Sequence, residues 1–156
     1  MPIKTGRVVA VSDFVCRNPN YDADAQAMFA AQAFMQNLKG ALTISELGHA
    51  QITAPFLESS SQQHGFFHGG VVGALADNAM GCSAFTLFEP GDHILTVEYK
   101  VNLLAPADGD IILAKGWVVK SGKTLTVTQG EIFVEKNGNR KLCATATGTM
   151  MRMTKS

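Results

Sequence analysis

One acidic side chain stands inside the most apolar segment of the sequence. Between Gly69 and Phe88 the residues are small or apolar on every side, and Asp77 is the only charged residue among them. Burial disfavours the charged form of a carboxylate unless hydrogen-bond donors or water support it, and such carboxylates cluster at functional sites. Asp77 is therefore a candidate catalytic carboxylate. Two other interpretations are that it caps a neighbouring loop or faces solvent at the edge of a dimer.

Two glycines, Gly69 and Gly70, open the same segment. Glycines leave room for a ligand to approach the backbone, and the first amide groups of a helix have no partner within it. Because the helix dipole adds positive potential at this end, the amide of Gly69 is suited to stabilise negative charge on a carbonyl oxygen. Gly70 is a second candidate contact to substrate. Tight packing against another helix explains a Gly-Gly pair equally well.

Gly69 and Asp77 lie too far apart to act on one small group within a single chain. Asp77 lies eight positions after Gly69, which corresponds to about 12 Å along a helix at 1.5 Å per residue. Two antiparallel copies of this helix would bring the Gly69 end of one chain against the Asp77 turn of the other. The spacing therefore predicts a symmetric dimer with two composite sites.

The elements that must position these residues follow from hydrophobic patterning. A capped amphipathic helix is predicted over 21–39, before Gly40, and a hairpin of two short strands over 42–55. The apolar helix over 69–88 comes next. Four long strands follow, over 94–104, 111–120, 124–135 and 141–152, and Asn137-Gly138 predicts a two-residue hairpin turn between the last two. Because the connections between these four strands are too short for crossovers, the order predicts an α+β fold, with an antiparallel sheet wrapped around a central buried helix.

The composition is typical of one globular domain and excludes several classes of function. The chain has 156 residues, 46% of them apolar, and thirteen basic residues balance thirteen acidic ones. This balance predicts no nucleic-acid partner, and no apolar run approaches the ~20 residues that a bilayer requires. A cytoplasmic protein with no membrane association is expected.

Neither a disulfide framework nor a metal site is expected. The three cysteines, Cys16, Cys82 and Cys143, are far apart and are predicted to be small core residues. His64 and His68 are the only close histidines, and no third metal ligand is evident near them. We therefore predict a protein without metal or cofactor.

The segment GFFHGGVVGALADNA, residues 65–79, resembles the signature of the hotdog-fold acyl-CoA thioesterases. The similarity is greatest to the phenylacetate-pathway (PaaI-like) branch of the 4-hydroxybenzoyl-CoA thioesterase superfamily. An acid stands nine residues after the histidine of His-Gly-Gly, and Gln62 precedes that histidine by six residues. Further similar residues are Pro55, Ala105-Pro106-Ala107 and Ser121-Gly122-Lys123-Thr124-Leu125. The resemblance covers roughly residues 38–151.

The resemblance implies a role for each matched position. Asp77 matches the catalytic carboxylate, which acts as nucleophile or as general base toward water. Gly69 matches the glycine whose amide polarises the thioester carbonyl, and Gln62 matches a polar residue that orients the thioester or the water. His68 matches the motif histidine, which is a hydrogen-bonding scaffold more often than an acid or base. Thr96 is a candidate for the hydroxyl that some members place beside the acid.

The resemblance also implies an acyl-CoA substrate, whose phosphates require local cations because the net charge of the chain is zero. The candidate substrate contacts at one strand turn are Lys120, Ser121, Gly122 and Lys123. Arg140 and Lys141 compete for this role, and simple solvation of turn lysines is an equally good explanation.

We thus predict an acyl-CoA thioesterase with a single hotdog domain over 21–156 and an N-terminal extension over 1–20. The strand-like part of the extension, 3–14, would add an edge strand or cover the acyl tunnel. The enzyme would be a dimer or a dimer of dimers and would hydrolyse a short, medium or aromatic acyl thioester, of CoA or of a carrier protein. The apolar acyl pocket would be lined by Phe66, Phe67, Met80 and Phe85. The alternative is a non-catalytic acyl-CoA-binding or sensing protein, which would not need Asp77.

Overall fold

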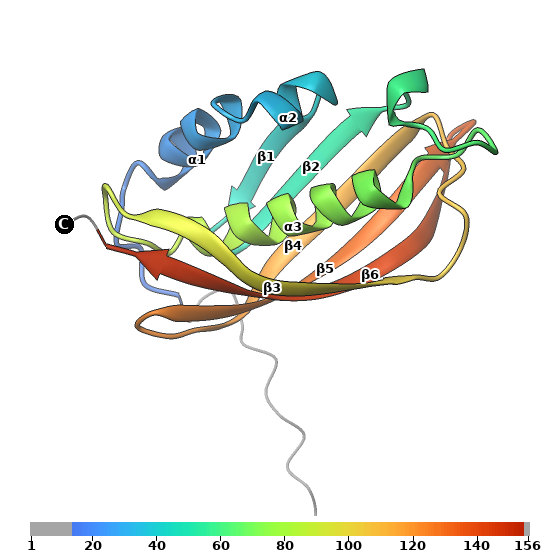
Figure 1. The fold of residues 1–156 in the computed structure, drawn as a ribbon. Helices are drawn as coiled ribbons and strands as arrows, with labels where there is room; N and C mark the ends of the chain where they lie inside the picture. The colour runs from blue at the N-terminus through green and yellow to red at the C-terminus, as the bar shows by residue number, and fades with distance from the viewer. Residues whose placement is uncertain (1–13, 155–156) are drawn as a thin grey trace, which may run out of the picture.

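The computed structural model, described here for residues 14–154, consists of one antiparallel sheet curled around one helix (Figure 1). The central helix is α3 (Gly69–Phe85), and two short helices, α1 (Tyr21–Ala30) and α2 (Ala33–Asn37), lie on the same side of the sheet. The strands are β1 (Ala41–Glu46), β2 (His49–Pro55), β3 (His93–Leu103), β4 (Ile111–Ser121), β5 (Leu125–Lys136) and β6 (Asn139–Met153). The predicted α+β fold is confirmed. None of the helices in this part of the chain is long and apolar enough to cross a membrane.

The six strands are arranged in the order β1-β2-β4-β5-β6-β3, so β3 is an edge strand. Two-residue turns join β1 to β2 at Leu47-Gly48 and β5 to β6 at Asn137-Gly138. Gly48, Asn137 and Gly138 have positive φ, and both residues of the Asn137-Gly138 turn therefore have the backbone that tight hairpins favour. A bulge between Thr96 and Glu98 interrupts the pairing of β3 with β6. The strand β3 has a neighbour on one side only, and several of its large apolar side chains are exposed, namely Leu95, Val97, Tyr99 and Leu103.

The helix α3 contacts the sheet directly through its backbone. A Cβ atom on Gly116 of β4 would lie 2.3 Å from the carbonyl carbon of Ala79 and 2.5 Å from the amide nitrogen of Met80. Gly130, opposite Gly116 on β5, and Gly148 on β6 make room for the Met80 side chain in the same way. Glycines on three different strands thus form the surface on which α3 packs.

The sheet covers only one side of α3, which differs from the helix buried on all sides that we predicted. The residues that face the sheet are buried, among them Leu75, Ala76, Ala79 and Met80. An opposite stripe is partly or fully exposed and runs through Gly70, Ala74, Asp77, Gly81 and Phe85. A curled sheet cannot close around a helix completely, and mostly small residues occupy the open side.

The single helix predicted over 21–39 is wrong, because the chain forms two helices with a break at Gln32. The backbone of Gln32 is extended, and its side-chain Oε1 accepts a 2.6 Å hydrogen bond from Asn78 of α3. Neither Gly nor Pro marks the break, which coincides with this contact to α3. The segment ends at Lys39, whose backbone is left-handed (φ 54°). The next position, Gly40, has no room for a side chain, because a Cβ atom there would lie 3.1 Å from the Phe29 ring.

The N-terminal extension is described only from Phe14 onward. Residues 1–13, which hold most of the predicted strand-like part, lie outside the described residues, and Phe14 belongs to no strand. Its ring packs against Gly48, where a Cβ atom would lie 2.7 Å from it. Cys16 is exposed on this surface segment, contrary to our expectation, whereas Cys82 and Cys143 are buried as predicted. The division into 1–20 and 21–156 stays a prediction.

The contact between Gly116 and α3 leads to a stability prediction. We expect Gly116→Ala to lower the free energy of unfolding by about 1–3 kcal/mol or more, because the added methyl would meet backbone atoms that cannot rotate away. In the control, Gly81→Ala, the methyl would meet no atom closer than 4.0 Å and should gain helix propensity of about 1 kcal/mol. Urea unfolding checks both values, and equal stability of the two variants would contradict this account of the core.

Candidate functional site

Asp77 lies at the mouth of a hollow between α3 and the edge strand β3. Its Oδ1 accepts a 2.8 Å hydrogen bond from the hydroxyl of Thr96. Burial raises the pKa of Asp77 above its ordinary value, and the hydrogen bond from Thr96 opposes part of that rise. The carboxylate is half-buried rather than fully enclosed, so it can reach water or a ligand.

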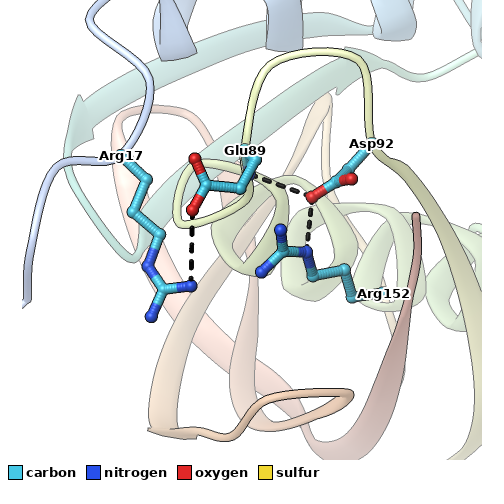
Figure 2. Close-up of polar contacts among 4 residues, drawn as sticks. All are labelled: Arg17, Glu89, Asp92 and Arg152. Carbon is cyan, nitrogen blue, oxygen red and sulfur yellow. Dashed lines mark hydrogen bonds and ion pairs between the residues drawn. The ribbon is translucent and has the colours of Figure 1, made fainter. Parts of the chain in front are cut away.

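A network of ion pairs holds the start of β3, which carries Thr96 (Figure 2). Asp92 is buried, and its Oδ2 accepts hydrogen bonds from the amide of Glu89 and from the guanidinium of Arg152 on β6. Arg17, before α1, pairs with the Glu89 carboxylate at 3.6 Å, but both side chains are about half exposed, so this pair adds little stability. The buried pair of Asp92 and Arg152 therefore sets the position from which β3 begins.

The opposite end of α3 presents one amide group. His68 is the N-cap residue, and its Nδ1 accepts a 2.9 Å hydrogen bond from the amide of Gly70. The amides of Val71 and Val72 donate to the carbonyl of His68. Within residues 14–154, only the Gly69 amide of this first turn has no hydrogen-bond partner. Of the two glycines predicted to contact substrate, Gly69 thus has its N–H available, and Gly70 has not.

A second hollow, of about 260 Å³, opens beside Gly69 and is mostly apolar. It is lined by Gln62, Phe66, Phe67, Gly69, Val72, Leu103, Ala105, Pro106, Ala107 and Cys143. Two of the four residues predicted to line an acyl pocket, Phe66 and Phe67, line this hollow. Met80 is absent because it points into the sheet, and Phe85 is absent because it packs against Phe88 beyond the other end of α3.

Gln62 is fixed in this hollow by its own loop. Its backbone amide donates a 2.9 Å hydrogen bond to the carbonyl of Phe66, and its side-chain Oε1 accepts a hydrogen bond from the backbone amide of His64. This leaves the Nε2 donors of Gln62 available to a ligand, since no partner for them occurs in the described part of the chain.

The hollow beside Gly69 and the one beside Asp77 share no lining residue. A single chain therefore does not bring the Gly69 amide and the Asp77 carboxylate together, which agrees with the separation predicted along the helix. Thr96 does lie beside Asp77, and Gln62 does lie beside Gly69, so each candidate partner accompanies one of the two groups.

The predicted cation cluster lies apart from both hollows. Lys120, Ser121, Gly122 and Lys123 form the exposed end of the hairpin between β4 and β5. The Gly122 amide donates a 2.8 Å hydrogen bond to the carbonyl of Leu125, so this glycine has a structural role in the turn. The competing cation Arg140 pairs with Glu135, whereas neither lysine of this turn has an ion-pair partner among residues 14–154.

Several residues around the site were missed by our sequence analysis. Met28, Gln32 and Asn78 line the Asp77 hollow, and Cys143 lines the Gly69 hollow. Burial raises the pKa of Cys143 to about 11, and burial together with the Asp77 charge raises that of Cys82 to about 12, so both thiols are neutral at physiological pH. Met28 belongs to the apolar spacing of the predicted helix, which does not indicate what it faces, and no spacing signal marks Gln32, which lies in the helix break. Residues 14–154 hold no group of three or more potential metal ligands.

Comparisons with known proteins agree with this architecture. Residues 64–141 match the thioesterase superfamily. A 1,4-dihydroxy-2-naphthoyl-CoA hydrolase of Listeria monocytogenes is 29% identical over 98 residues, which cover 63% of this chain and 78% of that protein. The crystal structure of a thioesterase family protein from Silicibacter pomeroyi has a TM-score of 0.85 at 36% identity, over 86% of this chain and 99% of that one. The Escherichia coli PaaI protein of the phenylacetic acid degradation operon shares the fold, with a TM-score of 0.77 at 24% identity over 88% and 96% of the two chains.

This chain belongs to the thioesterase superfamily and is a thioester hydrolase of the hotdog fold.

The raised pKa of Asp77 predicts that this carboxylate reduces stability at neutral pH. A folded-state pKa above the unfolded one means that the ionised group opposes folding. This effect begins to shrink as the pH falls below the folded-state pKa and disappears below the unfolded-state pKa, where the group is protonated in both states. We therefore expect Asp77→Asn to have a Tm at pH 7 equal to or above that of the native protein, with the difference shrinking in acid.

The matched control is Asp92→Asn, which weakens the buried pair with Arg152. Loss of one partner of a buried pair typically costs about 3–5 kcal/mol, so its Tm at pH 7 should fall by several degrees. Thermal unfolding followed by circular dichroism checks both variants. A large loss of stability in Asp77→Asn would show that Asp77 is a structural residue.

Proposed function

We propose that this protein hydrolyses short, medium-chain or aromatic acyl-CoA thioesters at two composite sites of a homodimer. Each site would combine the Gly69 amide of one chain with the Asp77 carboxylate of the other. The observation that carries the proposal is the arrangement on α3: an unpaired amide at the helix N-terminus, and a carboxylate held by Thr96 two turns away, in separate hollows.

The exposed surfaces of the single chain support the dimer. Leu95 and Leu103 of the edge strand β3 are 54% and 62% exposed, and the open stripe of α3 lies beside this strand. Long apolar edge strands are prone to pair with another strand. Pairing of two β3 strands around a two-fold axis would continue the sheet and would bring the two α3 helices together in antiparallel orientation.

The Gly69 amide would act on the thioester carbonyl. In the transition state the carbonyl oxygen gains negative charge, and an N–H donor at a helix N-terminus stabilises that charge. Gln62, in the same hollow, would orient the thioester or the attacking water through its Nε2 donors. His68 would act as a scaffold that caps the helix and leaves the Gly69 amide free.

The Asp77 carboxylate would supply the base or the nucleophile. As a base it removes a proton from water, the hydroxide attacks the carbonyl carbon, the C–S bond breaks, and the CoA thiolate leaves and takes up a proton. As a nucleophile it attacks the carbonyl carbon itself, and water then hydrolyses the resulting anhydride. Both routes yield the free acid and CoA, and both require the ionised carboxylate that the Thr96 hydroxyl favours.

The CoA phosphates would be bound at the turn between β4 and β5. Lys120 and Lys123 offer two cations without ion-pair partners among the described residues, and Ser121 and Gly122 belong to the same turn. Cations that are not already neutralised attract a phosphate more strongly than Arg140, which Glu135 neutralises.

The hydrogen bond from Thr96 predicts the pH dependence of the reaction. Since activity requires ionised Asp77, kcat/KM should decrease as the pH falls through the raised pKa of this group. Thr96→Val removes the interaction that lowers this pKa, so the acidic limb of the profile should move to higher pH. Thr147→Val, an exposed change on β6 away from Asp77, should leave the limb in place. An unchanged limb in Thr96→Val would contradict the proposed role of Asp77.

A complementation experiment tests the composite site. We expect Gly69→Val, which blocks approach to the amide, and Asp77→Asn each to reduce thiol release from acyl-CoAs by about 100-fold or more. Dimers that combine one chain of each variant contain one intact site, so randomly mixed chains should recover about a quarter of the native specific activity.

The control mixes Asp77→Asn with Asp77→Ala chains, which cannot form an intact site and should stay inactive. If each site lay within one chain, the first mixture would stay inactive as well. Binding of acyl-CoA by the native protein without hydrolysis of any short, medium or aromatic member would replace the proposed enzyme by a binding protein.

A further inference from the structure

The wall of the Asp77 hollow is built partly by the N-terminal helical segment. The hollow has a volume of about 360 Å³ and is lined by Met28, Gln32, Asp77, Asn78, Gly81, Cys82, Ile94, Leu95 and Thr96. Met28 belongs to α1, and Gln32 lies in the break between α1 and α2, where its side chain contacts Asn78 of α3. The helix break therefore places the polar side chain of Gln32 in the wall of the Asp77 hollow.

The backbone of Gln32 is fully used, which holds the residue in place. Its amide donates a 3.1 Å hydrogen bond to the carbonyl of Phe29 at the end of α1, and its carbonyl accepts one of 3.1 Å from Gln36 in α2. Its side-chain Oε1 accepts from Asn78, the residue next to Asp77. Gln32 is thus fixed at three points relative to the candidate carboxylate.

The side-chain hydrogen bond between Gln32 and Asn78 leaves the Nε2 donors of Gln32 unused. With Oε1 of Gln32 bound to Asn78, the two N–H groups of Gln32 Nε2 have no partner among residues 14–154. The Asn78 oxygen is occupied, since it accepts from the Cys82 thiol at 3.8 Å. A half-buried amide with unused donors favours a ligand atom that accepts a hydrogen bond.

The charge of the hollow restricts the acceptor further. Asp77 is the only charged residue of the lining, so a second carboxylate on the ligand would be repelled. Besides Asp77 and the polar side chains of Gln32, Asn78 and Thr96, the lining is apolar or small and includes Met28, Ile94 and Leu95. The chemistry of the wall therefore suits a small apolar skeleton that carries one neutral acceptor group.

From these contacts we infer that Gln32, positioned by Asn78, is a specificity-determining residue that selects acyl groups with a hydroxyl or oxo substituent. The inference rests on the proposed function, because it assigns the Asp77 hollow to the acyl group of the substrate. A volume of about 360 Å³ is at the lower end of the range for ligand pockets, which favours a short chain or a single ring as the acyl group.

Paired substrates that differ by one hydroxyl group test this inference. Hexanoyl-CoA is compared with monohydroxylated hexanoyl-CoAs, and benzoyl-CoA with the monohydroxylated benzoyl-CoAs. The native protein should prefer at least one hydroxylated member by about tenfold in kcat/KM, the effect of one hydrogen bond in a partly buried site. Gln32→Leu should abolish that preference and leave kcat/KM for the unsubstituted partner within about twofold.

Two further variants separate recognition from a structural role. Asn78→Ala releases the Gln32 side chain and should reduce the preference without removing the donor. Gln36→Leu, an exposed change in α2 of the same segment, should preserve it. An equal decrease of both members of a pair in Gln32→Leu, or an unchanged preference, would overturn the inference, as would a native enzyme without preference in either series.

The experiment also distinguishes this inference from the proposed function. If the native protein hydrolyses the unsubstituted thioesters and Asp77→Asn does not, the proposed function stands whatever the result for Gln32. If the native protein hydrolyses no substrate of either series, the proposed function is wrong and the inference falls with it.

Discussion

The backbone contact between α3 and Gly116 is the constraint on which the rest of the structure depends. No side chain separates helix from sheet at this point, so neither the height nor the rotation of α3 can vary without a clash. In an α-helix each residue is rotated by about 100° from the previous one. The contact that presses Ala79 onto the sheet therefore turns Asp77, two residues earlier, to the opposite side and toward Thr96 on β3. One steric requirement buries the core and also exposes the carboxylate.

Two aspartates near the same strand show how surroundings decide what a carboxylate does. Asp92 is buried but receives an amide hydrogen and the Arg152 guanidinium, so its charge is compensated and it fixes the loop before β3 (Figure 2). Asp77 accepts a hydrogen bond from one hydroxyl only, that of Thr96, so its partial burial raises its pKa. Asp92 fixes the start of β3, and β3 carries Thr96, the hydrogen-bond partner of Asp77. The position of Thr96 therefore does not depend on the charge of Asp77.

The sequence predicts the elements well where the pattern is local. The four long strands, the apolar helix and the turn at Asn137-Gly138 all depend on neighbouring residues, and the structure confirms them. The failures concern distant contacts. The break at Gln32 occurs where its side chain is hydrogen-bonded to Asn78, 46 residues away. Met80 was placed in the acyl pocket because periodicity identifies an apolar face but not its neighbour. Thr96 came from the family resemblance, since a bulge directly after it disturbs the alternation of β3.

The division of the candidate site between two ends of one helix has an electrostatic advantage in the proposed dimer. A second chain over the open stripe of α3 would remove water from Asp77 and so disfavour its charge. The same chain would bring the N-terminus of its own α3 toward that carboxylate, and the positive potential of a helix N-terminus favours the charged form. Within a single chain, no such compensation is possible, because the two ends of a rigid helix cannot meet. Formation of the dimer would thus remove water from Asp77 and supply the positive potential of a helix N-terminus in one step. Asp77 would stay ionised, and the lower local dielectric constant would strengthen its interaction with a thioester.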